Sequence, residues 1–92
     1  MSPMDALPGA ELVEEGLRDL ARGAETQAAL LVSIGAPKLR SLGIAVPETV
    51  LANPENRLYA LLAGEDSDAA HGRYNALIRR LVSYERATAC AR

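Results

Sequence analysis

The chain has 92 residues, a formal net charge of −2, no tryptophan, no phenylalanine and three tyrosines. One domain is expected at this length, and the abundance of alanine and leucine with so few aromatic side chains favours helices over strands. The charge balance argues against a generally basic nucleic-acid-binding protein, and the lone cysteine, Cys90, excludes an internal disulfide framework.

The charges are not evenly distributed along the chain. Acidic side chains outnumber basic ones up to Ala28, whereas arginines dominate from His71 onward. All basic residues except Lys38 are arginine, which, together with the high alanine content, is typical of a GC-rich bacterial genome. The N-terminus does not resemble a secretory signal, and no stretch approaches membrane-spanning length. We therefore expect a cytoplasmic protein that does not enter membranes.

The first helix is predicted to run from about Pro8 to Arg22, after a flexible segment of residues 1–7. Proline fits the first turn of a helix, and Gly23 is able to adopt the left-handed conformation that ends one. The spacing i, i+4, i+7, i+11 predicts one buried stripe, formed by Val13, Leu17, Leu20 and Ala24.

A second helix is predicted over residues 25–34, with Gly35 as its end. An alternative is that Gly23 does not end the first helix but only bends the chain between the first two helices. A short helix over residues 37–42 follows, because proline fits its first turn. Two helices around Gly35 hint at a helix-turn-helix, but the second is too short for a DNA-reading helix. Residues 44–53 are expected to form the main loop.

The clearest start and stop signals flank residues 54–63. Asn53 is a good N-cap and Pro54 is a good first helical residue, while Gly64 is expected to end the helix. Three leucines of this helix are predicted to face inward: Leu58, Leu61 and Leu62.

The last helix is predicted to begin near Asp66 or Ser67 and to reach about Ala89, as the longest element. Its apolar residues form a seam that is expected to be either the central packing element or a dimer interface. The seam comprises Ala70, Tyr74, Leu77, Ile78, Leu81, Tyr84 and Thr88. The sequence therefore predicts an all-α fold, a compact bundle of four to five helices in one domain spanning residues 1–92.

Six polar side chains of the last helix form the most distinctive cluster in the sequence. Their amide, imidazole and guanidinium groups suit the oxygens of carboxylates or phosphates. We identify them as candidate contacts for an anion or a partner: His71, Arg73, Asn75, Arg79, Arg80 and Arg86. The alternative is that they form ion pairs with the acidic first helix of the same molecule.

Two further features bear on chemistry. Gly9, Gly16 and Gly23 recur every seven residues, which predicts a shallow groove along the first helix where another helix packs closely. His71 is the only histidine, so a two-histidine metal site is excluded, and no catalytic residue, metal or cofactor is assigned.

These features favour a non-catalytic helical protein–protein interaction module or a small accessory subunit. We expect the chain to self-associate as a homodimer or to bind a larger protein. The alternative is a small regulator that binds nucleic acid or another anion through the basic C-terminal helix. Enzyme activity, with His71 as acid or base and Arg79 as an anion clamp, is the least favoured interpretation.

Overall fold

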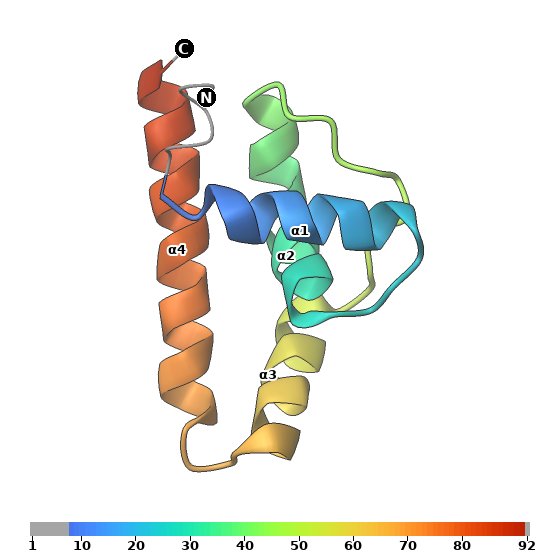
Figure 1. The fold of residues 1–92 in the computed structure, drawn as a ribbon, viewed down its shortest axis with the longest axis vertical. Helices are drawn as coiled ribbons and strands as arrows, with labels where there is room; N and C mark the ends of the chain where they lie inside the picture. Colours follow the sequence, from blue (N-terminus) through green and yellow to red (C-terminus); the bar gives the residue numbers. More distant parts are fainter. Residues whose placement is uncertain (1–7, 92) are drawn as a thin grey trace.

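The computed structural model describes residues 8–91, and within this range the chain forms four α-helices and no strand. The helices are α1 (Ala10–Ala21), α2 (Gln27–Ser41), α3 (Pro54–Glu65) and α4 (Ala70–Ala91). Figure 1 shows α3 and α4 as a hairpin, with α1 running across α2 from a start beside α4. The expected all-α class and long C-terminal helix are confirmed for these residues. The expected flexibility of residues 1–7 concerns a segment outside the described range.

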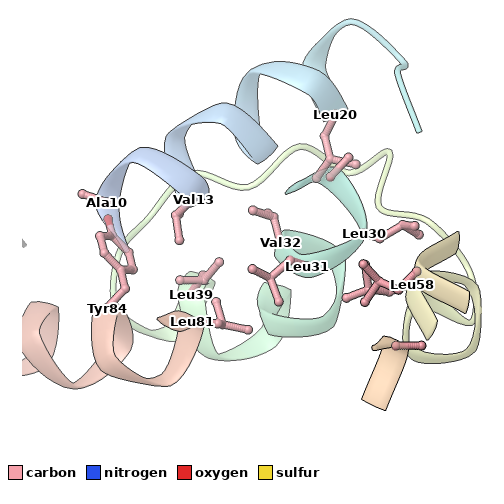
Figure 2. Close-up of a cluster of buried hydrophobic side chains, with 13 residues drawn as sticks. Ala10, Val13, Leu20, Leu30, Leu31, Val32, Leu39, Leu58, Leu81 and Tyr84 are labelled. Atoms are coloured by element: carbon pink, nitrogen blue, oxygen red, sulfur yellow. The ribbon is translucent and has the colours of Figure 1, made fainter. Parts of the chain in front are cut away.

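The most buried helix is α2, which packs against each of the other three. All residues from 28 to 33 are buried. In Figure 2, Leu31 and Val32 lie at the centre of a cluster to which every helix contributes, including Leu81 from α4. The seam of α4 therefore packs inside the molecule, but α2 rather than α4 is the central element.

The predicted break of the second helix at Gly35 is wrong, because α2 continues through Gly35 and Pro37 without a turn. Gly35 packs closely against α4: a Cβ here would lie 3.0 Å from both δ carbons of Leu81, which would have to shift. Proline removes one helical hydrogen bond, but Pro37 is exposed, and the buried Leu39 beyond it secures the last turns. Tertiary packing thus overrides two local stop signals, and no helix-turn-helix forms.

The seven-residue glycine spacing is explained by packing within the molecule. A Cβ at Gly16 would lie 2.3 Å from the carbonyl oxygen of Ala28, so glycine lets α1 cross α2 closely. A Cβ at Gly9 would lie 2.6 Å from the carbonyl oxygen of Arg80. Gly23 has no such neighbour and instead ends α1 with a φ of 77°. The predicted groove is therefore filled by α2 and α4 of the same chain.

A buried carboxylate joins the end of α1 to the start of α2. Asp19 is only 5% exposed and accepts hydrogen bonds from Arg22 Nη2 (2.7 Å) and Thr26 Oγ1 (2.5 Å). Thr26 Oγ1 in turn accepts from the N–H of Ala29 at 3.1 Å and caps α2. The hydrogen bond from Thr26, and then the one from Arg22, hold the pKa of the Asp19 carboxyl below its usual value, although burial opposes the shift.

The predicted loop over residues 44–53 contains no helix and is tied to α1 and α2 by side-chain hydrogen bonds. Ser33 Oγ donates to the carbonyl of Ala29 at 2.9 Å and accepts from the N–H of Leu51 at 3.0 Å. Thr49 Oγ1 donates to the carbonyl of Leu20 at 3.2 Å. The loop is therefore a fixed cover over the α1–α2 contact.

The boundaries of α3 and α4 differ from the predicted ones by a few residues. Asn53 precedes α3 as expected, but it has a left-handed φ of 49° and makes no side-chain cap, and the helix continues past Gly64 to Glu65. Asp66 Oδ1 accepts from the N–H groups of Asp68 and Ala69, so it caps a turn that precedes α4. The prediction that Leu61 faces inward is wrong, because Leu61 is 38% exposed.

Candidate functional site

The six candidate contacts on α4 do not form one patch. Successive residues of an α-helix are rotated by about 100°, so Arg79 and Arg80 point in different directions. Arg73 and Arg80 are seven residues apart and share one face of α4. The other face carries four residues at spacings of four, four and seven, which we call the outer row: His71, Asn75, Arg79 and Arg86.

The face with Arg73 and Arg80 borders two adjoining hollows. The first, the α4 hollow, has a volume of about 240 Å³ and is lined by Gln27, Leu62, Glu65, Arg73, Ala76, Leu77 and Arg80. The second, the α1 hollow, has a volume of about 400 Å³ and is lined by Leu12, Glu15, Thr26, Gln27, Ala28, Leu61 and Glu65. The two hollows share Gln27 and Glu65, and we call them together the recess; residues of α1, α3 and α4 line it around the start of α2.

A polar network occupies the boundary between the two hollows. Glu65 Oε2 accepts from Gln27 Nε2 at 2.8 Å, and Glu65 Oε1 accepts from Arg73 Nη1 at 3.2 Å. The side chains of Arg73 and Glu65 are 52% and 48% exposed, so their ion pair adds little stability. Its effect is geometric, because it fixes side chains of α2, α3 and α4 relative to one another.

The two edges of the recess carry opposite charges that are not neutralised within residues 8–91. Arg80 lines the α4 hollow and Glu15 lines the α1 hollow, and both are exposed. Neither takes part in an ion pair with another described residue. The recess therefore has a basic edge on α4 and an acidic edge on α1, with apolar side chains between them, including Leu12, Leu61 and Leu77.

The outer row is a separate polar surface. His71 Nε2 and Asn75 Nδ2 are 3.2 Å apart, and Arg79 and Arg86 are exposed. The alternative, in which these side chains form ion pairs with the acidic first helix, is not found among residues 8–91. The ion pairs there join Arg22 to Asp19, Arg57 to Glu25, and Arg73 to Glu65. The charges of Arg79 and Arg86 thus face solvent.

A hollow of about 660 Å³ lies elsewhere, along the loop after α2. It is lined by Arg40, Gly43, Ile44, Ala45, Val46, Glu48 and Val50. The guanidinium of Arg40 is engaged there by the carbonyl of Pro47 at 3.0 Å. None of the six candidate contacts lines this depression.

The described residues offer His71 no acidic partner, because its side-chain hydrogen bond is to Asn75. They also contain no group of three side chains able to hold a metal ion. Among helices α1 to α4, none is both long and apolar enough to cross a membrane. The arrangement of the recess and the outer row is suited to binding through charge and shape.

Sequence reasoning found Arg73 and Arg80 but missed the other walls of the recess. Gln27 and Glu65 are 38 residues apart, and no motif links them. Glu15 follows no motif either, because its sequence context does not distinguish an ordinary helix-end charge from an interface charge. No protein-family model, curated protein or solved structure matches the chain.

Proposed function

We propose that the chain is a non-catalytic helical protein-interaction module that self-associates, and that the recess forms its interface with a second copy. The observation that carries this proposal is the pair of opposite charges at the two edges of the recess, Glu15 and Arg80, neither of which is in an ion pair with another residue of 8–91. A surface that carries both signs is able to complement itself.

Two-fold symmetry makes this complementarity specific. In a two-fold dimer each residue contact occurs twice, so Glu15 of one copy faces Arg80 of the other at two equivalent places. Leu61, half-buried Leu12 and half-buried Leu77 supply apolar contact between these charged ends. Charges at the rim and leucines at the centre match the usual anatomy of a protein interface.

The exposed apolar surface sets the expected strength of the dimer. The large apolar side chains exposed in residues 8–91 are Tyr59 and Leu61, and both are on α3. Obligate dimers bury broad apolar faces, whereas transient ones rely on smaller, more polar contacts. We therefore expect a reversible dimer that dissociates on dilution and at high salt. Most of the apolar seam of α4 is not available for this contact, because Ala70, Leu81 and Tyr84 are buried inside the molecule, whereas half-buried Leu77 of the same seam lines the recess.

Sedimentation equilibrium over a range of protein concentrations tests the proposal. The wild-type chain is expected to show a monomer–dimer equilibrium, and Arg80→Glu is expected to raise its dissociation constant about tenfold or more, because the charge contact occurs twice and becomes repulsive. Arg79→Glu is the matched control, since it makes the same charge change at the next residue but on the outer row. Circular dichroism shows whether each variant is folded.

Two outcomes would overturn self-association through the recess. One is a wild-type chain that stays monomeric at every concentration, which would leave a larger protein as the partner. The other is an effect of Arg79→Glu as large as that of Arg80→Glu, which would show a dependence on net charge rather than on this surface.

A further inference from the structure

The outer row is a second surface that self-association through the recess does not use. Counted from His71 at about 100° per residue, its four members lie within a sector of about 80° of α4. Arg79 and Arg86 are two helical turns apart on this sector, about 10 Å along the helix axis. Both guanidinium groups are exposed and have no carboxylate partner among residues 8–91.

The acidic groups near α4 lie elsewhere. Glu85, the one carboxylate on α4, is half-buried and faces α2, because a Cβ at Gly35 would be 3.3 Å from Glu85 Oε2. Burial raises the pKa of the Glu85 carboxyl, and the nearby charge of Lys38 opposes this shift. The chain leading into α1 approaches α4 at Arg80 and Tyr84, on the flank opposite the outer row. Arg79 and Arg86 of the outer row therefore form no ion pair with any carboxylate of residues 8–91.

The chemistry of these side chains favours phosphate. Guanidinium groups form paired hydrogen bonds with phosphate oxygens and stay charged at any physiological pH. The amide of Asn75 and the ring of His71 add hydrogen-bonding groups along the same line. A linear row of such groups matches a linear array of phosphates better than it matches a single small anion.

We propose that the outer row binds the phosphodiester backbone of a nucleic acid without reading its bases. Base recognition by stacking requires exposed rings beside the phosphate contacts, but Tyr84 is buried and Tyr74 is half-buried. The exposed ring, Tyr59, lies on α3 rather than on α4 and packs against Tyr74, with ring centroids 5.8 Å apart. A membrane surface fits less well, because helices that bind lipid headgroups also insert large apolar side chains. The outer row carries none, and the residue between its two arginines on this face, Val82, is half-buried.

Salt dependence gives the expected signature of binding. Two arginines that neutralise two phosphates predict that the logarithm of the association constant falls with the logarithm of the salt concentration at a slope of about −2. Binding is expected to be independent of sequence and weak at physiological salt. It is measured by fluorescence anisotropy with a labelled 20-base-pair DNA duplex and with a mixed-sequence single-stranded RNA.

The chain contains a matched pair of double variants for this test. Arg79→Gln/Arg86→Gln and Arg73→Gln/Arg80→Gln each remove two positive charges from α4 at a spacing of seven residues. The first is expected to weaken binding at least tenfold and to flatten the salt dependence, whereas the second is expected to stay within about threefold of wild type. Both are measured at protein concentrations where sedimentation shows monomer, so that loss of the dimer does not mimic loss of binding.

Three outcomes would overturn this proposal. The first is no binding to either nucleic acid at 20 mM salt, and the second is an equal loss of binding in both double variants. The third is tighter binding to vesicles containing phosphatidylserine than to nucleic acid at equal salt, which would make a lipid surface the ligand. None of these outcomes affects the test of self-association, which depends on Arg80 and not on Arg79.

Discussion

Arg79 and Arg80 are neighbours in the sequence but belong to surfaces that are built differently. The recess, which Arg80 lines, takes its walls from α1, α2, α3 and α4, and its network links Gln27 to Glu65 across 38 residues. The outer row, which contains Arg79, needs only that α4 is helical. The recess should therefore be sensitive to changes in helix packing, whereas the outer row should tolerate any change that leaves α4 folded.

Among the variants that distinguish the recess from the outer row, Gly16→Ala is expected to lower the unfolding free energy most. The added Cβ would lie 2.3 Å from a backbone oxygen of α2 and 2.4 Å from Val32 Cγ2, so α1 has to move away and the acidic wall of the recess moves with it. Overpacking of this kind costs about 3 kcal/mol of unfolding free energy. Urea denaturation measures the loss, and an unchanged midpoint would mean that α1 is not held at this crossing.

The next largest effect on stability is expected at Asp19, the carboxylate that joins α1 to α2. Because the pKa of Asp19 is lowered in the folded chain, its stabilisation is present above the unfolded value and is lost as the pH falls through the folded value, in the range below about pH 4. Asp19→Asn is expected to lower stability at pH 7 and to flatten the acid limb of the stability profile. Urea titrations at pH 7, 5 and 3 check this, and an acid limb identical to that of wild type would exclude the role of Asp19.

A smaller change in the unfolding free energy, this time a gain in stability, is expected for a substitution on α4. A Cβ at Gly72 would meet nothing within 4 Å, and the residue lies inside a helix. Gly72→Ala should therefore raise the unfolding free energy by up to about 1 kcal/mol through helix propensity alone. Gly72→Ala should leave the dissociation constant of the dimer and the affinity for polyanions unchanged. A stabilised variant that loses either self-association or polyanion binding would show that Gly72 itself is part of a contact surface.

The smallest effect on stability is expected from Arg73→Gln. The ion pair of Arg73 with Glu65 is half exposed on both sides, so its loss should cost no more than about 1 kcal/mol. Thermal denaturation in low and high salt measures this loss, which should shrink as salt screens the pair. A cost of several kcal/mol would mean that the Gln27–Glu65–Arg73 network holds the helices together instead of only orienting side chains at the recess.

Local signals predicted much of the fold because they depend on neighbouring residues. Pro54 begins α3 as expected, Gly23 ends α1 in the left-handed conformation, and every residue of the apolar seam of α4 is buried or half-buried. The same signals failed at Gly35 and Pro37, where contact with Leu81 and burial of Leu39 keep the helix continuous. Such contacts join distant parts of the chain and leave no local trace.

Prediction of the candidate sites from the sequence has the same limit, because contacts between distant residues leave no local pattern. The separation of Arg80 from Arg79 follows from helical rotation and was within reach of the sequence. The meeting of Arg80 with Gln27 and Glu65 was not, because it depends on how α2 and α3 pack against α4. A polar cluster along a helix is therefore better analysed by face than by sequence position.

The most direct test of the central claim is a charge swap across the recess, measured by sedimentation equilibrium. Glu15→Arg and Arg80→Glu should each shift the chain towards monomer, because each places like charges opposite one another in a two-fold dimer. The double variant restores opposite charges at both places and should recover a dissociation constant within about threefold of wild type. A double variant that remains as monomeric as the single variants would contradict self-association through the recess.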